Sequence, residues 1–137
     1  MAPALYLDTS AVLRAVLEGG TIPDVERRVR AAPILITSRL SLVESARALL
    51  RLQQQARLRE ERLLEAERAI DVIWGRCELW ELTASVCDLA QRVAPRRPLR
   101  SLDALHLATY VIARRKIGDL ELVSADERLL AAAVSAV

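Results

Sequence analysis

Short apolar runs alternate with longer helical patterns along the sequence, and this alternation limits the fold more than any other feature. Apolar runs at residues 4–7, 34–37, 78–82 and 121–123 each predict a short buried strand. Between them, apolar residues recur at helical spacing. Strands and helices in alternation predict an α/β fold, in which helices cover both faces of a central, mostly parallel β-sheet.

The expected helices begin and end at residues that commonly cap or break helices. Thr9 and Ser10 are expected to cap the first helix, and Gly19-Gly20 to end it. Thr83 and Ser101 are expected to cap two later helices. Residues 53–55 and the charged helix after them are expected to form an exposed helical arm. The remaining helices are expected over residues 25–32, 41–57, 59–75, 83–93 and 103–114, and from residue 125 onward.

Length and composition agree with this class of fold. The sequence has 137 residues, which favours one compact domain over residues 1–137. Apolar residues make up 53% and aromatic residues only 3%, so the core must consist of Leu, Val, Ile and Ala. No stretch reaches the roughly 20 apolar residues of a membrane span, and no signal peptide opens the chain. We therefore expect a cytoplasmic protein.

The charge balance excludes a protein that coats nucleic acid by charge alone. The formal net charge is +2, from 20 basic and 18 acidic residues, so a positive surface for RNA would have to be local. Cys77 and Cys87 lack cysteine or histidine partners at metal-ligand spacing. We expect both to be buried thiols rather than a zinc site or a disulfide.

Acidic residues fall where predicted strands give way to helices. Asp8 directly follows the first strand, Glu44 lies about one helical turn after the second, Asp103 opens a helix, and Asp126 lies just past the fourth strand. The carboxyl ends of parallel strands share one edge of a sheet, and ligands bind in the crevice there. The four carboxylates are therefore expected to converge on one spot.

Converging carboxylates repel one another, so they must share protons or hold a cation. An all-oxygen set without a cysteine or histidine cluster favours a hard ion, Mg²⁺ or Mn²⁺. Such an ion binds substrate phosphate and lowers the pKa of an attacking water. Metal-assisted hydrolysis of a phosphodiester is the chemistry that this arrangement best supports.

Each acid also has a purely structural interpretation. Ser41 and Glu44 fit a capping box, and Asp126 suits the first turn of the last helix. Asp8 and Asp103 are harder to explain in this way. Asp8 ends an apolar run, and Asp103 opens a helix that is apolar on nearly every face, where an unpaired charge is costly.

Four segments of the chain carry a resemblance to a known family. They are residues 5–11 (LYLDTSA), residues 36–38 with 41–44 (ITS and SLVE), residues 100–108 (RSLDALHLA) and residues 122–129 (LVSADERL). Together they resemble the PIN-domain ribonucleases, and specifically the VapC-type toxins of toxin–antitoxin pairs. The resemblance covers essentially the full chain.

The resemblance implies a PIN-like fold and a Mg²⁺- or Mn²⁺-dependent endoribonuclease. It assigns Asp8, Glu44, Asp103 and Asp126 to the catalytic metal site, although the last acid varies more in such proteins. It also implies that Ser10 or Ser124 orients a metal-bound water or a carboxylate. A homodimer and a cognate VapB-type antitoxin, whose tail covers the active site, are the implied partners, with RNA as substrate.

Two other functions remain open at this point. One is a housekeeping PIN nuclease that processes RNA, which would keep the same acids. The other is a PIN-like binding module without catalysis, against which the full set of acids argues. The RNA target and the number of metal ions are not determined by the sequence.

Several further residues have both a functional and a structural interpretation. His106, the only histidine, lies three residues after Asp103 on the same helix face, which favours packing or support beside the metal site over a general base. Trp74 and Trp80 favour core or dimer packing over base stacking. The candidates for phosphate contact are four arginines: Arg96, Arg97, Arg100 and Arg39.

Overall fold

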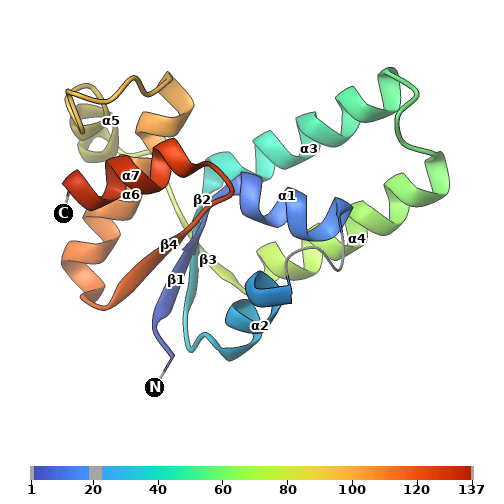
Figure 1. Ribbon diagram of the computed structural model, residues 1–137, viewed down its shortest axis with the longest axis horizontal. Helices are drawn as coiled ribbons and strands as arrows, with labels where there is room; N and C mark the ends of the chain where they lie inside the picture. The colour runs from blue at the N-terminus through green and yellow to red at the C-terminus, as the bar shows by residue number, and fades with distance from the viewer. Residues whose placement is uncertain (1, 19–22, 137) are drawn as a thin grey trace.

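Four short strands form one parallel sheet in the order β3-β2-β1-β4 (Figure 1). The computed structural model describes residues 2–18 and 23–136. The strands are β1 (Ala4–Leu7), β2 (Leu35–Ser38), β3 (Cys77–Trp80) and β4 (Leu120–Val123). All three pairings are parallel, which confirms the predicted α/β class.

Helices connect the strands and differ from the expected ranges by only a few residues at most ends. They are α1 (Thr9–Leu17), α2 (Pro23–Ala31), α3 (Arg39–Gln54), α4 (Glu60–Gly75), α5 (Ala84–Ala90), α6 (Ser101–Ile117) and α7 (Glu127–Ala136). The predicted stop at Gly19-Gly20 lies outside the described residues. No helix within the described ranges is both long and apolar enough to cross a membrane.

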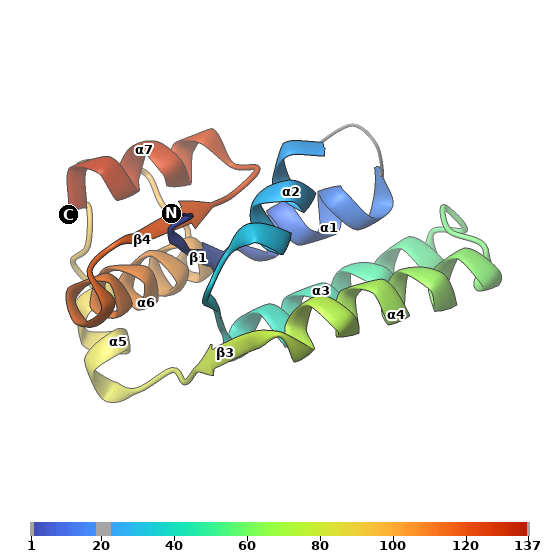
Figure 2. The ribbon, with the colours of Figure 1, turned by 90° about the horizontal axis from the view of Figure 1, so that it is seen from below.

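The sheet separates two apolar cores, because successive side chains of a strand point to opposite faces. Leu5 and Leu7 of β1 pack with α1, α2, α3 and α4 on one face. Ala4 and Tyr6 pack with α6 and α7 on the other, where residues of α5 also contribute. Figures 1 and 2 show the two helical layers on either side of the strands. Since β1 is completely buried, an acid at its end lies at the centre of the molecule.

The two strands that pair with β1, β2 and β4, lie on opposite sides of it and are reached at different stages of the chain. The chain passes through α1 and α2 to β2 on one side, and it reaches β4 on the opposite side only after α5 and α6. Neighbouring parallel strands with diverging connections leave a crevice at their carboxyl ends. The backbone N–H of Asp8 donates to the carbonyl of Val123 at 2.9 Å, so β1 and β4 meet at this crevice.

Three predicted caps proved wrong in detail. The N-cap of α3 is Ser38, whose hydroxyl accepts from the N–H of Leu40, so Ser41 lies inside the helix. The helix after β1 has Asp8 as its N-cap, and the helix α6 begins at Ser101 after an Arg100 cap. The predicted Thr83 cap of α5 is confirmed by the bond from the Val86 N–H at 3.2 Å.

The helices α3 and α4 run side by side and extend well beyond the sheet (Figure 2). Residues 53–55 are exposed near the far end of this pair, as the prediction of an exposed arm requires. Inside the arm, the indole Nε1 of Trp74 donates to the Ser45 hydroxyl at 3.0 Å, and both residues are buried. Trp74 is therefore a core residue, as expected.

Candidate active site

Asp8 is a buried carboxylate at the crevice, only 6% exposed. Its Oδ2 accepts hydrogen bonds from Ser10 Oγ at 2.6 Å and from Ser124 Oγ at 2.7 Å. Ser10 comes from α1, and Ser124 follows β4, which pairs with β1 so that Leu7 lies opposite Val123. The strand register thus brings Ser124 beside Asp8 across a sequence separation of 116 residues.

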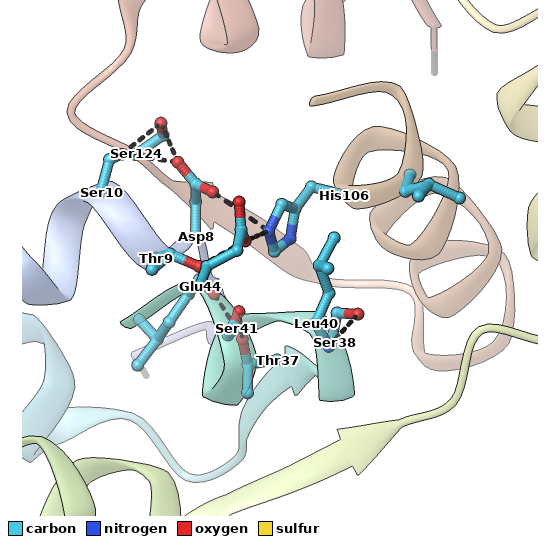
Figure 3. A network of polar contacts seen from close by, with 12 residues as sticks. Asp8, Thr9, Ser10, Thr37, Ser38, Leu40, Ser41, Glu44, His106 and Ser124 are labelled. Carbon is cyan, nitrogen blue, oxygen red and sulfur yellow. Dashed lines mark hydrogen bonds and ion pairs between the residues drawn. The ribbon is translucent and has the colours of Figure 1, made fainter. Parts of the chain in front are cut away.

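Glu44 reaches the same region from α3 (Figure 3). Its Oε1 accepts from Thr9 Oγ1 at 2.8 Å and lies 2.5 Å from His106 Nε2. The expected capping box does not form, because α3 begins at Arg39 and Glu44 therefore lies past its first turn. Its carboxylate faces the site instead of the end of its own helix.

The contacts of Glu44 favour its ionised form. Burial on its own would raise the pKa of Glu44, but the hydrogen bond and electrostatic attraction of His106, together with the Thr9 hydrogen bond, lower it below the ordinary value. Glu44 is thus a carboxylate held in its charged form.

His106 is completely buried on α6, with 1% exposure. Its Nε2 lies 2.5 Å from Glu44 Oε1 and 3.7 Å from Asp8 Oδ1. Its Nδ1 lies 2.8 Å from the hydroxyl of Tyr6, a fully buried residue of β1. The ring therefore contacts Tyr6 of β1 through Nδ1 and the carboxylates of Glu44 and Asp8 through Nε2.

A common pattern links the two carboxylates. Donors occupy one oxygen of each: Oδ2 of Asp8 takes the two serine hydroxyls, and Oε1 of Glu44 takes Thr9 and His106. Within residues 2–18 and 23–136, neither Asp8 Oδ1 nor Glu44 Oε2 accepts a hydrogen bond. Each acid thus presents one oxygen that a bound ligand could use.

Asp103 and Asp126 complete the acidic region. Burial raises the pKa of Asp103 above its ordinary value, and the negative charges of Asp126 and Asp8 raise it further. A backbone hydrogen bond at Arg100 and the attraction of His106 oppose this effect only in part. The three aspartates therefore interact electrostatically, and their charge is not fully compensated.

Asp126 also has the structural role that the sequence suggested. Its Oδ1 accepts from the backbone N–H of Arg128 at 2.9 Å, at the start of α7. Around it, Ser10 Oγ accepts from the Ala125 N–H at 3.1 Å and Ser124 Oγ from the Asp126 N–H at 3.0 Å. The segment after β4 is thus tied to both α1 and Asp8.

The donor set fits a hard divalent cation. It consists of carboxylate and hydroxyl oxygens, which Mg²⁺ and Mn²⁺ prefer, and a cation would relieve the repulsion that raises the pKa of Asp103. As the side chains lie, no three acidic, histidine or cysteine residues in the described ranges enclose a single point.

Sequence reasoning missed two residues of this network. Thr9 was considered only as a helix cap, whereas its hydroxyl donates to Glu44, 35 residues away. Tyr6 was read only as part of an apolar strand, whereas its hydroxyl meets His106. The available hint was a tyrosine within a run of aliphatic core residues, because a buried hydroxyl needs a partner.

The predicted arginines lie in different settings. Arg96, Arg97 and Arg100 are exposed and form no ion pair within the described part of the chain. Arg97 also lines a hollow of about 210 Å³ together with Leu99 and Arg128, close to Asp126 in sequence. Arg39 forms a two-point pair with Glu81 at 2.6 and 2.9 Å. The loop arginines are therefore freer to meet a phosphate than Arg39.

Trp80 and the two cysteines complete the sequence candidates. Trp80 packs against the core on the α6 side, with Lys116 Nζ 5.6 Å from its ring centroid. Cys77 is partly buried, and burial raises the pKa of its thiol to about 11. The prediction of two buried thiols was wrong for Cys87, which is exposed because it lies on the outer side of the short helix α5.

Comparison with known proteins identifies the family. The profile of the PIN domain matches residues 5–135, almost the whole chain. The chain belongs to the PIN-domain family. Ribonucleases VapC45 and VapC49 from two strains of Mycobacterium tuberculosis are each 31% identical to this PIN domain over 129 residues, which span 93% of it and 87% of each relative. These relatives agree with the VapC-type resemblance of the motifs.

Solved structures share the fold of this PIN domain. PAE2754 from Pyrobaculum aerophilum superposes with a TM-score of 0.67 at 23% identity, covering 96% of this chain and 81% of that one. The toxin VapC20 of M. tuberculosis, described as cleaving the sarcin–ricin loop, gives a TM-score of 0.62 at 20% identity, covering 93% and 94%. VapBC2 from Rickettsia felis, solved on a promoter DNA fragment, gives 0.59 at 13% identity, covering 90% and 99%.

Proposed function

We propose that this PIN domain is a Mg²⁺- or Mn²⁺-dependent endoribonuclease and the toxin of a type II toxin–antitoxin pair. The observation that carries the proposal is the pair of carboxylates of Asp8 and Glu44, each with one oxygen that accepts no hydrogen bond from the described residues, and the negative charges of Asp103 and Asp126 near them. The VapC ribonucleases among its relatives support the same activity.

The residues of the chain have distinct tasks in this mechanism. Asp8, Glu44, Asp103 and Asp126 would hold the ion, which supplies charge neutralisation at the phosphate and a more acidic attacking water. Ser10 and Ser124 restrain Asp8 so that its Oδ1 faces the crevice. Thr9 does the same for Glu44. Arg96, Arg97 and Arg100 would bind the RNA backbone beside the acids.

The partners follow from the relatives. The R. felis neighbour was solved as a VapBC complex, which supports a VapB-type antitoxin for this chain too. We propose that this antitoxin covers the acidic crevice and that the toxin acts as a homodimer. The chemistry of the site does not distinguish a toxin from an RNA-processing nuclease, but the VapC names of the relatives favour the toxin.

The acids are tested by removing their charge without changing their shape. We expect Asp8→Asn and Asp103→Asn to cleave RNA about 100-fold or more slowly, since even supporting residues around a metal contribute 10- to 100-fold. Both variants should also lose Mn²⁺ binding in isothermal titration calorimetry. Asp71→Asn, an exposed acid on α4, is the matched control and should behave like the wild type.

Two results would contradict the proposal. Folded Asp8→Asn and Asp103→Asn variants that cleave at the wild-type rate would exclude the acids from catalysis. A wild type that binds no Mn²⁺ would support an inert binding module instead. For the toxin role, induction of the wild type should arrest growth, and induction of Asp8→Asn should not.

A further inference from the structure

His106 has a fixed place behind the acids that the proposed mechanism does not use. The imidazole is 1% exposed, so water competes for neither nitrogen. Nδ1 meets the Tyr6 hydroxyl at 2.8 Å. Nε2 meets Glu44 Oε1 at 2.5 Å, a contact that Figure 3 draws between the two labelled residues. Tyr6 is itself 0% exposed at the centre of the sheet, which anchors the ring from behind.

The two neighbours of the ring decide where its proton lies. Glu44 Oε1 accepts the Thr9 hydroxyl and lies 2.5 Å from Nε2, and a carboxylate can only accept hydrogen bonds. Nε2 must therefore carry a hydrogen, and in a neutral imidazole Nδ1 is then the acceptor. The Tyr6 hydroxyl, 2.8 Å from Nδ1, is the group that donates to it.

We propose that Tyr6 and His106 are positioning residues: the Tyr6 hydroxyl donates to Nδ1 and anchors the ring, so that its Nε2 N–H holds Glu44 in place for metal binding. This proposal rests on the proposed metal site. The Tyr6 hydroxyl also has Thr109 and Ser38 as hydrogen-bond neighbours, but of these partners only His106 bonds Glu44, so the effect of Tyr6 on Glu44 passes through the ring. This relay of hydrogen bonds from Tyr6 through His106 to Glu44 leaves Glu44 Oε2 without a hydrogen bond, because His106 and Thr9 both bond to Oε1.

Loss of the Tyr6 hydroxyl should release this arrangement. Without that donor, Nδ1 is a buried acceptor that has lost its partner, and the ring loses its bond to β1. The ring can then turn, so that its Nε2 N–H no longer points at Glu44 Oε1. Glu44 would be less firmly placed, and the metal affinity would fall although every acid is still present.

Tyr6→Phe and Tyr110→Phe form a matched pair for the test. Both tyrosines are buried in the same apolar core, but the Tyr110 hydroxyl donates to the Leu120 carbonyl at 3.1 Å and not to His106. Because His106 is the only histidine, ¹⁵N spectra of the imidazole report on this ring alone. The spectra are recorded at pH 8 on the metal-free protein.

We expect a protonated Nε2 and a hydrogen-bonded, unprotonated Nδ1 in the wild type and in Tyr110→Phe. In Tyr6→Phe the Nδ1 resonance should move toward that of an imidazole nitrogen that accepts no hydrogen bond. A protonated Nδ1 in the wild type, in the other tautomer or in the imidazolium ion, would overturn the proposal. An unchanged Nδ1 resonance in Tyr6→Phe would do so as well.

Mn²⁺ titration tests the consequence for the site. We expect Tyr6→Phe to bind Mn²⁺ about tenfold more weakly, within the usual range for groups that orient metal ligands, and Tyr110→Phe to match the wild type. His106→Gln keeps an N–H near the position of Nε2 and should retain more affinity than His106→Leu. In the His106→Gln background, Tyr6→Phe should have no further effect, because its path to Glu44 is gone.

The outcomes separate this proposal from the proposed function. If the wild type binds Mn²⁺, Asp8→Asn does not, and Tyr6→Phe binds like the wild type, the metal site stands and the relay is wrong. Additive losses for Tyr6→Phe and His106→Gln would also overturn the relay. Absence of Mn²⁺ binding by the wild type would overturn both.

Discussion

Asp103 and Glu44 lie in the same crevice but in opposite electrostatic settings. Burial and two like charges raise the pKa of Asp103, whereas hydrogen bonds from His106 and Thr9 outweigh burial and lower the pKa of Glu44. One carboxylate therefore costs folding free energy when it ionises, and the other contributes to stability. Neighbouring acids in one crevice need not share one response to pH.

This contrast predicts stability changes of opposite sign in the metal-free protein. For Asp103, the cost is absent below the ordinary aspartate pKa and grows as the pH rises through the raised folded-state pKa. We therefore expect Asp103→Asn to be more stable than the wild type at pH 7, by up to about 1 kcal/mol for a partly exposed group. The advantage should vanish in acid. Urea unfolding in EDTA at several pH values measures it.

For Glu44→Gln we expect the opposite change in the stability of the metal-free protein. The stability from the lowered pKa of Glu44 is present above its unfolded-state value and is lost as the pH falls through the folded-state value. We expect Glu44→Gln to be less stable by about 1 kcal/mol at pH 7, a modest value for a half-buried hydrogen-bonded charge. Equal effects of the two substitutions at pH 7 would contradict the assigned environments.

At the scale of the elements, the ends of helices were the least predictable part of the fold. The sequence motif at Ser41 and Glu44 suits a capping box, but the observed N-cap is Ser38, three residues before Ser41, and its hydroxyl accepts from the Leu40 N–H. Ser41 then bonds Thr37 at 2.7 Å. Several hydroxyls were available, and only the position of the preceding strand decides which one caps.

The arm formed by α3 and α4 depends on one buried polar contact. Ser45→Ala would leave the indole N–H of Trp74 unpaired in the core, which typically costs about 1–3 kcal/mol. We expect a lower urea midpoint with an unchanged slope. Ser85→Ala, on the exposed surface of α5, is the matched control and should unfold like the wild type.

At the scale of the whole molecule, the sequence predicted the parallel sheet and its two helical layers well. Four apolar runs and their order suffice for a parallel sheet, and the rule for strand ends brings Asp8 and Asp126 to one edge. The hydrogen bonds around the acids could not be predicted from the sequence. Thr9 with Glu44 and Tyr6 with His106 are separated by 35 and 100 residues, so only tertiary packing pairs them.

The distribution of charge over the molecule predicts how RNA binding responds to salt. With a net charge of only +2, affinity should depend on the exposed arginines beside the acids. We expect the triple variant Arg96→Gln, Arg97→Gln, Arg100→Gln to bind single-stranded RNA more weakly. The slope of log affinity against log salt concentration should become shallower by about 2, because each lost phosphate contact contributes roughly 0.7. Fluorescence anisotropy across a salt series measures both.

The control removes three exposed arginines from the far end of the arm: Arg51, Arg57 and Arg59, each changed to Gln. These substitutions alter the net charge equally but leave the surface beside the acids intact. An equal loss of slope in both triple variants would show that binding follows total charge and not the loop.

The parallel pairing of β1 with β4 also has a consequence for the time at which activity can arise. Asp8 is among the first residues to leave the ribosome, but Ser124, which holds its Oδ2, and the strand that places it are made more than 110 residues later. Domains are synthesised from the amino end, and their distant contacts must wait. A ribosome-bound chain that has not yet released β4 therefore lacks the contact that holds Asp8, so the proposed nuclease centre can be complete only after β4 and Ser124 have been made.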